Sequence, residues 1–461
     1  MIKSFLNLSA GALMGLPCLY AEENKKPNLT ATWLDAALSG KEVVIPEETT
    51  PLAAGDVEME QNRLWKAYTE AARRARWDRE LLPVPETIAK MTERRKRPQL
   101  TAGSLKSGEH EMPYLFMAKG EKPATGWPMF ICLHGGGQQK VEKAHGWDVN
   151  TREWQAQMSL TGRVYKPSGL YFIPRMADDR LGRWWHKHNI DIFTRVIRHA
   201  ILFNDVDPNK IYIMGISQGG YGSCHLAPFM ADLFAAAGPM AGGMMTVTEN
   251  LRNLPFRSDI GEKDTMFKRI EYAQQLHEAI DAHKAKDPEG YKNVLAIQKG
   301  RGHGIDYSLS PTWLATNTRN PHPERIVWRC HNKHGIFRDN FYWLSLTNTP
   351  EKGEFRIVAS LDKKNNLVTI TAEEVTPAKE QGEEPSRKPL TASQIVVHLN
   401  DAMLDLEKEI TIELNGNQAF KGMLQRSQGT ILRNLVERGD INYAFPAEVK
   451  VGGTAKNGSP E

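Results

Sequence analysis

Cysteine is scarce in this sequence: the 461 residues include four, at positions 18, 132, 224 and 330. A fold built on disulfides would carry more of them at close spacing. We therefore expect the internal cysteines to be small buried hydrophobic residues. The histidine pairs at 186/188 and 331/334 have no carboxylate or thiolate partner in the pattern, so the sequence predicts no metal site and no cofactor.

The sequence also lacks a strong charge excess, with 59 basic against 55 acidic residues and a net charge of +4. Its one basic run, residues 94–97, ends a polar helix-like stretch before Pro98, which is typical of a solvated helix end. We therefore expect no nucleic-acid partner. At 40% hydrophobic and 25% charged residues, the composition indicates a globular protein with one large or two ordinary domains.

A long apolar run is missing as well, and the one short run lies at the N-terminus. Lys3 precedes an apolar core at residues 5–16, which is too short to span a bilayer and ends at Pro17. Ala21 offers a small residue for cleavage, so residues 1–21 are predicted to be a signal peptide of a secreted or periplasmic protein. Cys18 raises the alternative of a lipid anchor, although Pro17 fits that processing site poorly.

Three regions follow the predicted signal. Residues 22–100 indicate a polar helical extension, and residues 101–320 alternate strands with helices, which is typical of a mainly parallel sheet covered on both faces. The pattern predicts a hairpin over 105–117, a helix over 191–203, and strands over 129–133, 170–173, 211–214, 234–237, 256–260 and 294–298.

Residues 321–461 change to strand after strand, which predicts a β-rich, sandwich-like C-terminal domain. A tight hairpin is expected at Asn415-Gly416 and a solvated loop over the charged residues 377–389. The expected strands lie over 325–328, 341–344, 355–358, 367–370, 395–397 and 410–414.

A Gly-x-Ser-x-Gly motif at residues 215–219 follows the strand-like run 211–214 and precedes small residues that can open a helix. A serine between two glycines at a strand-to-helix reversal is the pattern of a nucleophile elbow. In an open α/β sheet, ligands bind beyond the carboxyl ends of the strands. The motif therefore places Ser217 where a substrate would meet it.

Two further motifs supply the partners of such a serine, in the order serine, acid, histidine. His303, between two glycines after a predicted strand, is the candidate base. Asp264, in the turn after the strand 256–260, is the candidate that would orient the imidazole and stabilise its charged form. Asp259 within the strand and Asp306 beside the histidine are rivals.

An oxyanion needs backbone N–H donors, and a loop without side chains lets its amides approach closely. The three glycines after His134 follow the predicted strand 129–133. Gly135 and Gly136 are the candidate donors there, together with Gln218, the residue after the serine.

Arg183, Trp184 and Trp185 follow the predicted strand 170–173, and therefore lie near the same edge of the sheet. Their aromatic surface and positive charge could hold a carbohydrate-like or aromatic substrate by stacking. The alternative is that the two tryptophans pack against the domain.

The motifs described above resemble those of secreted α/β-hydrolases of the polyhydroxybutyrate depolymerase and feruloyl esterase type. They are also similar to the catalytic domain of prolyl-oligopeptidase-like hydrolases. The resemblance covers about residues 100–315 and implies the triad Ser217, Asp264 and His303, with the oxyanion loop after His134. The strand-like residues 341–344 resemble the C-terminal β domain of some bacterial envelope hydrolases.

Three functions stay open on the sequence. The first is a secreted hydrolase of carboxylic esters, acting on an ester substrate that a polymer or glycan carries. The second is a serine peptidase, and the third is a glycan- or polymer-binding protein on a hydrolase scaffold. About 80 residues lie between the predicted signal and the first predicted strand, too few for a gating propeller whose blades each need about 40 to 50 residues. An open site is therefore expected, which favours the ester hydrolase.

Overall fold

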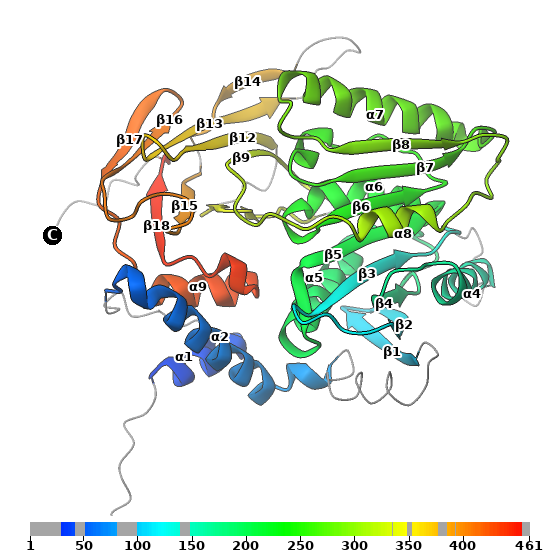
Figure 1. Ribbon diagram of the computed structural model, residues 1–461, viewed down its shortest axis with the longest axis horizontal. Helices are drawn as coiled ribbons and strands as arrows, with labels where there is room; N and C mark the ends of the chain where they lie inside the picture. Colours follow the sequence, from blue (N-terminus) through cyan, green and yellow to red (C-terminus); the bar gives the residue numbers. More distant parts are fainter. Residues whose placement is uncertain are drawn as a thin grey trace, which may run out of the picture.

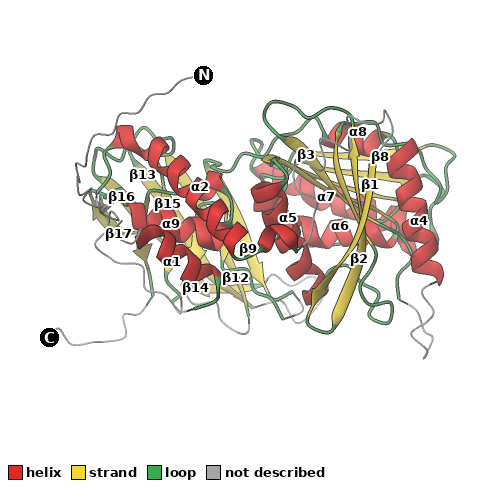
Figure 2. Cartoon of the chain, turned by 90° about the horizontal axis from the view of Figure 1, so that it is seen from below, coloured by secondary structure: helices red, strands yellow, loops and turns green. Residues whose placement is uncertain are grey.

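The computed structural model describes residues 29–41, 51–80, 99–138, 148–333, 335–347, 353–376, 385–391 and 393–453. The predicted signal at 1–21, Cys18 and the basic run at 94–97 lie outside these residues. The described chain forms two lobes, one built on a large sheet and the other on two smaller sheets (Figures 1 and 2).

The large sheet has eight strands in the order β1-β2-β4-β3-β5-β6-β7-β8. The pairs β1–β2 and β2–β4 are antiparallel, and every later pair is parallel. This order with an antiparallel second strand is that of the α/β-hydrolase fold, so the expected fold class is confirmed. The strands are β1 (Gln99–Ser107), β2 (His110–Lys119), β3 (Trp127–Leu133), β4 (Gly169–Pro174), β5 (Val206–Ile216), β6 (Ala236–Met240), β7 (Phe256–Gly261) and β8 (Asn293–Gln298).

Alternation along the strands divides the sheet between two apolar layers. In β3, Ile131 and Leu133 belong to the layer under three helices, whereas Phe130 and Cys132 belong to the opposite layer. Because both faces are covered, the central strands are apolar throughout rather than at every second residue. The first layer holds α5 (Lys187–Phe203), α6 (Gln218–Phe229) and α7 (Arg269–Lys286), and the second holds α4 (Asp148–Arg163) and α8 (Leu309–Leu314).

The C-terminal lobe contains a four-stranded sheet, β10-β11-β15-β18, and a six-stranded sheet, β17-β16-β13-β12-β9, with β14 paired to β13. Asn415 and Gly416 join β16 to β17 with φ angles of 51° and 79°, so the predicted tight hairpin is confirmed. The strands are β9 (Arg325–His331), β10 (Asn340–Phe341), β11 (Leu344–Leu346), β12 (Glu354–Asp362), β13 (Leu367–Thr376), β14 (Ser386–Pro389), β15 (Ile395–Leu399), β16 (Ile410–Leu414), β17 (Asn417–Gly422) and β18 (Ala447–Val451).

Three expectations for this lobe were wrong in part. Residues 341–344 are not one strand, because Tyr342 turns the chain with a φ of 52° between β10 and β11. The sequence interpretation also missed α9 (Gln428–Arg438), which begins at the cap Ser427 and ends at Gly439 in a left-handed conformation. Of the expected loop at 377–389, residues 377–384 lie outside the described part and Ser386–Pro389 form β14.

The N-terminal helices α1 (Leu29–Leu38) and α2 (Val57–Arg74) pack on both lobes. Leu64 and Tyr68 of α2 lie in one apolar cluster with Phe203 at the end of α5 and with Leu435 of α9. Figure 2 shows α2 lying across α9. Short 3₁₀ helices complete the described elements: η1 (Ala54–Asp56), η2 (Trp77–Arg79), η3 (Ala231–Leu233), η4 (Thr248–Leu251), η5 (Met266–Lys268) and η6 (Ile441–Tyr443).

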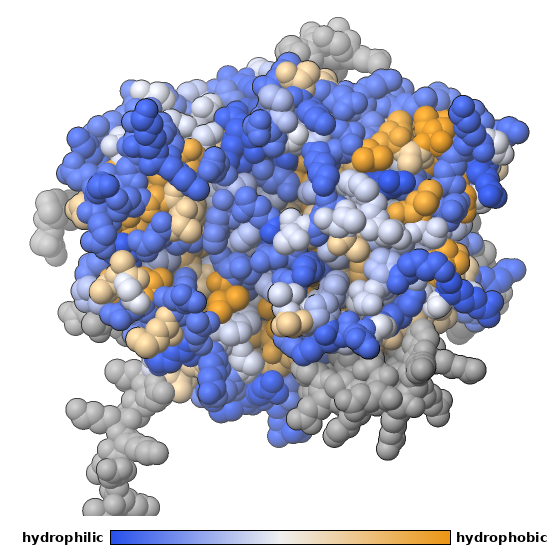
Figure 3. All heavy atoms as spheres, in the orientation of Figure 1, coloured by the Kyte–Doolittle hydropathy of each residue, from blue (hydrophilic) through white to orange (hydrophobic). Residues whose placement is uncertain are grey.

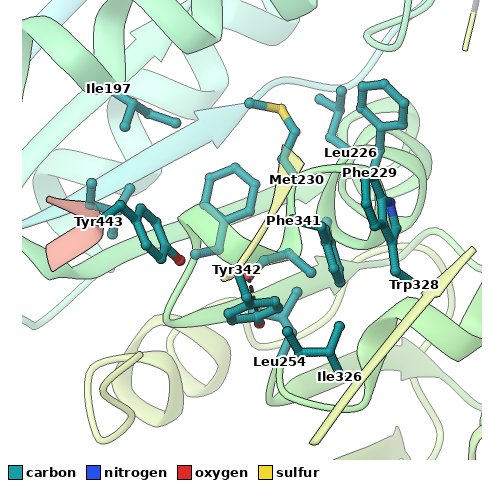
Figure 4. Packing of buried hydrophobic residues seen from close by; sticks show 14 of the residues in the cluster. Ile197, Leu226, Phe229, Met230, Leu254, Ile326, Trp328, Phe341, Tyr342 and Tyr443 are labelled. Atoms are coloured by element: carbon teal, nitrogen blue, oxygen red, sulfur yellow. Dashed lines mark hydrogen bonds between the residues drawn. The ribbon is translucent and has the colours of Figure 1, made fainter. Parts of the chain in front are cut away.

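The two lobes share an apolar interface, in which Phe229 and Met230 belong to the same cluster as Trp328 and Tyr342 (Figure 4). Asn209 near the start of β5, Ala231 before β6 and Asn253 before β7 bond residues of the C-terminal lobe, so this lobe is docked at the amino ends of the parallel strands. Arg319 illustrates the contact: its guanidinium bonds the side chain of Asn209 and the carboxylate of Asp440.

The described cysteines, at positions 132, 224 and 330, are buried, as the sequence predicted, and their thiols are free. None of the described helices is long and apolar enough to cross a membrane. The face drawn in Figure 3 is mainly hydrophilic, and one of its apolar patches lies over β8 and α8, where Ile297 and Leu309 are exposed.

Candidate active site

Ser217 lies at the sharp turn between β5 and α6, with φ 54° and ψ −111°. A side chain is rarely held at positive φ, so the turn is strained, as a nucleophile elbow is. The flanking glycines permit it: a Cβ at Gly215 would lie 2.3 Å from the Gly219 carbonyl oxygen, and a Cβ at Gly219 would lie 2.2 Å from that of Leu133. The motif therefore needs glycine at both positions.

Three backbone amides at the elbow and in the loop after β3 have no acceptor among the described residues. They belong to Gln218, the first residue of α6, and to Gly135 and Gly136 in the loop after β3. A Cβ at Gly135 would lie 3.4 Å from the Cβ of Ser217, so this loop lies directly beside the serine. Unpaired amides next to a serine are the arrangement that an oxyanion requires.

His134 fixes the start of this glycine loop. Its Nε2 accepts a hydrogen bond from the Met176 amide at 3.0 Å, and its Nδ1 lies 2.6 Å from the carbonyl oxygen of Gly135. A neutral ring with the proton on Nδ1 satisfies both contacts. Burial lowers the pKa of His134 to about 3, so the ring stays neutral at physiological pH.

The other end of the loop is held by Asn150 of α4. Its Oδ1 accepts from the Gly137 amide at 2.8 Å, and its Nδ2 donates to the Gly137 carbonyl at 2.9 Å. The same Nδ2 donates to Asp179, which forms a buried bidentate ion pair with Arg175 after β4. The sequence interpretation missed Asn150, Asp179 and Arg175, because residues so far apart along the chain leave no local pattern.

Asp264 and His303 meet after β7 and β8. The Asp264 Oδ2 lies 2.8 Å from His303 Nδ1, and the aspartate is buried while 45% of the histidine side chain is exposed. The rivals have other partners: Asp259 is paired with Arg257, and Asp306 accepts from Ser308. Of the three candidate carboxylates, only Asp264 contacts the histidine in the described structure.

Ser217 Oγ has no hydrogen bond among the described residues, so the structure joins Asp264 to His303 but does not join His303 to the serine. Hydrogen bonds between nucleophile and base are often long before a substrate binds. Ser217 is partly exposed, and His303 is exposed, so both are open to an approaching ligand.

The expected aromatic platform was wrong. Trp184 is fully buried, and its Nε1 donates to the His134 carbonyl at 3.2 Å, so it supports the glycine loop from behind. Trp185 is 8% exposed and packs on the ring of His225. Arg183 is the member of this trio that reaches the site, since its Nη1 donates to the Gln218 side chain at 3.1 Å. Two tryptophans after a strand can pack in the core as well as bind a ligand, so the sequence could not distinguish the two.

No group of three metal-ligating side chains occurs among the residues that the structure describes. His188 is buried and stacks on His110, and His331 packs edge-on against Phe229. His334 lies outside the described residues.

The strand order and the strained serine define the class of this chain: an α/β-hydrolase fold with an elbow in the usual place. No family model and no curated protein matches the sequence. Among solved structures, the chain is similar to a thermostable esterase at 22% identity and a TM-score of 0.34, over 48% of this chain and 63% of that one.

Two further likenesses belong to groups that the motifs resemble. A feruloyl esterase module from Clostridium thermocellum matches at 12% identity and a TM-score of 0.32, over 48% of this chain and 87% of that one. A poly(3-hydroxybutyrate) depolymerase from Bordetella parapertussis matches at 13% identity and a TM-score of 0.33, over 47% and 87%. Since each covers under half of this chain, the fold assignment rests on the strand order described above.

Proposed function

We propose that this protein is a serine hydrolase that cleaves carboxylic esters, with Ser217 as nucleophile, His303 as base and Asp264 as the carboxylate that orients the base. The observation that carries the proposal is the strained Ser217 beside unpaired amides, together with the 2.8 Å contact between Asp264 and His303. The alternative of a binding protein on a hydrolase scaffold gives no reason for this strain, which costs about 1 to 3 kcal/mol at a single residue.

The residues divide the reaction as follows. The hydroxyl of Ser217 attacks the carbonyl carbon while His303 Nε2 accepts its proton, and Asp264 stabilises the imidazolium that forms. The amides of Gly135, Gly136 and Gln218 donate hydrogen bonds that stabilise the negative charge on the carbonyl oxygen. His303 then returns the proton to the leaving alkoxide, and a water repeats the sequence to release the acid.

Esters are favoured over peptide amides as substrates because alkoxides leave more readily than amines. The exposure of His303 agrees with an open site that accepts an ester displayed on a larger molecule such as a polymer or glycan. Export directed by residues 1–21 would bring the enzyme to such substrates. The C-terminal lobe lies at the other end of the strands, so it does not shape the described part of the site.

The proposal is tested first with a fluorophosphonate probe, which labels activated serines. Ser217 is expected to be the labelled residue by peptide mass mapping. Ser217→Ala should abolish labelling and lower kcat by about 10⁴- to 10⁶-fold while leaving the unfolding midpoint unchanged. Ser310 is a matched control, since it is a fully buried serine of α8, and Ser310→Ala should keep both labelling and activity. Labelling of a different serine would reject the assignment.

Substrate class is tested with a panel of short-chain and hydroxycinnamoyl esters, glycan acetates and aminoacyl amides. The kcat/KM for the best ester should exceed that for any amide by at least about 10²-fold, which corresponds to roughly 2.7 kcal/mol of barrier. An amide cleaved as fast as the best ester would make the peptidase the better assignment. No turnover of any substrate, with Ser217 unlabelled, would favour the binding protein.

A further inference from the structure

A buried arginine completes the line of polar groups behind His303. Asp264 has two carboxylate oxygens: Oδ2 faces His303 Nδ1, and Oδ1 accepts from the Nη1 of Arg269 at 3.0 Å. Both Arg269 and Asp264 are buried, so this ion pair is poorly screened by water. The Asp264 carboxylate therefore interacts with both His303 and the permanent positive charge of Arg269.

Arg269 is in turn tied to the helix that carries the nucleophile. Its Nε donates to the hydroxyl of Tyr221 at 2.9 Å, and the Tyr221 amide donates to the Ser217 carbonyl at 3.0 Å in the first turn of α6. One guanidinium thus connects the helix of the elbow with the acid of the proposed triad. A structural link of this kind keeps the serine and the histidine at a fixed separation.

The local structure around Arg269 is unfavourable in two respects. Phe267 and Lys268, just before it, both have left-handed backbone angles, with φ 54° and 57°. Arg269 is the first residue of α7, where the helix dipole disfavours a positive charge. Strain that the fold maintains at one position points to a function of that position.

We propose that Arg269 is a positioning residue for the proposed triad, on which this inference rests: it holds the Asp264 carboxylate in place and opposes protonation of His303. A positive charge behind the carboxylate takes part of the negative charge that would otherwise stabilise the imidazolium. His303 therefore stays available as a neutral base at lower pH than it would with Asp264 alone. The cost is a weaker stabilisation of the imidazolium during the reaction.

Other charged or titratable groups surround the same place, and the test must leave them unchanged. They come from several elements: Tyr221 from α6, Glu262 and Lys263 from the turn before Asp264, Arg301, Asp306 and Tyr307 from the loop around His303, and Glu153 from α4.

The chain contains a matched control for Arg269. Arg257 of β7 also forms a largely buried ion pair, with Nε 2.7 Å from the Oδ2 of Asp259, but Asp259 does not contact His303. Arg269→Met and Arg257→Met therefore remove the same chemical group next to a buried aspartate, one inside the proposed triad and one outside it. Arg269→Lys keeps the positive charge beside Asp264 but loses the hydrogen bond to the Tyr221 hydroxyl.

The first measurement is the titration of His303 by NMR on protein labelled at the histidine rings, with the resonance assigned by loss in His303→Gln. Arg269→Met should raise the titration midpoint by about 0.5 to 1 pH unit. Arg257→Met should leave it unchanged, and Arg269→Lys should lie close to the wild type. This measurement needs no substrate, so it stands even where the proposed esterase activity fails. An unchanged or lowered midpoint in Arg269→Met overturns the inference.

The second measurement is the pH dependence of the rate at which fluorophosphonate labels Ser217. The wild type should show an acid limb, because His303 must be neutral to accept the proton of Ser217. In Arg269→Met the limb should move to higher pH in step with the NMR midpoint, and the plateau rate should fall by about tenfold as Asp264 loses its anchor. If Arg269 served only stability, Arg269→Met would lower the unfolding midpoint as Arg257→Met does and would leave the acid limb where it is in the wild type. That result would also overturn the inference.

Discussion

The two ends of the eight-stranded sheet differ in how they treat polar groups. At the carboxyl ends, the amides of Gly135, Gly136 and Gln218 have no acceptor among the described residues, and Ser217 is strained. At the amino ends, Arg319 forms an ion pair with Asp440 at 2.6 Å and donates to Asn209 and to the carbonyl of Asp232. One end leaves backbone donors open to a ligand. At the other end the C-terminal lobe pairs many polar groups, although Asp232 Oδ1, Arg338 Nη1 and Arg438 Nε have no hydrogen-bond partner among the described residues.

This difference separates the two requirements of the protein. Unpaired donors and backbone strain each cost stability, and an active site needs both. The ion pairs and aromatic packing at the opposite end offset that cost without touching the reacting groups (Figure 4). Substitutions at the amino ends should therefore lower stability without changing kcat.

The largest expected effect falls at the carboxyl ends. Asp264→Asn should lower kcat by about 10⁴-fold, because it leaves His303 in the wrong tautomer. It should also lower the unfolding midpoint, because the buried Arg269 loses its charged partner. Asp259→Asn, which breaks the pair with Arg257, should change kcat by less than about threefold. Steady-state kinetics on the best ester measures both. The opposite ranking would reassign the acid of the triad.

A large loss of stability is expected at the amino ends. Arg319→Met removes a buried charge and leaves Asp440 unpaired, which should lower the free energy of unfolding by about 3 to 5 kcal/mol. Urea unfolding measures this loss, and kcat of the folded fraction should stay within about twofold of the wild type. Arg63→Met breaks the exposed pair with Glu60 and should cost less than about 1 kcal/mol. Equal losses in both variants would contradict the contrast between the two ends.

A smaller effect concerns acid. His134 stays neutral in the folded protein down to a pKa of about 3, whereas the unfolded chain binds a proton below about 6.5. Its contribution to stability is therefore present above pH 6.5 and is lost as the pH falls toward 3, by about 1.4 kcal/mol for each pH unit. The free energy of unfolding is measured with urea at pH 7, 6 and 5. Its decrease per pH unit should be smaller by this amount in His134→Gln than in the wild type. The same slope in both proteins would mean that His134 is protonated in the fold.

The smallest effect is expected at the N-cap of α9, far from the site. The Ser427 Oγ accepts from the Thr430 amide, and Ser427→Ala should lower the free energy of unfolding by about 1 kcal/mol. Ser427→Asp keeps an acceptor at the cap and should retain most of the stability. Activity should not change in either variant. A loss of activity in Ser427→Ala would show that the lobes are coupled through α9.

The sequence predicted the parallel sheet and its elbow because local signals determine both. Runs such as residues 129–133 are apolar throughout, and the glycines around Ser217 have direct steric reasons. Whether an apolar residue faces a ligand or a core depends on the rest of the fold, which explains the error at Trp184. Residues 341–344 resemble a strand locally, but Tyr342 turns so that its hydroxyl reaches the Ala231 carbonyl in the other lobe.

The signals for α9 were present: a serine cap, apolar residues at helical spacing and a terminal glycine. They stood among strand patterns and were overlooked there. The groups that support the site could not be found in this way. Arg269, Tyr221 and Asn150 act through partners that lie 5 to 48 positions away along the chain. Only the folded chain brings those partners together.

The packing of α2 has a consequence for folding during synthesis. Its glutamine at position 61 donates to the Ala444 carbonyl, 383 positions later, and its apolar side lies against α9. The ribosome synthesises α2 long before α9. The apolar side of α2 therefore lacks its packing partner until nearly the whole polypeptide has been synthesised. During that interval Leu64 and Tyr68 lack their late partners, and a chaperone that shields apolar helices would find its target here.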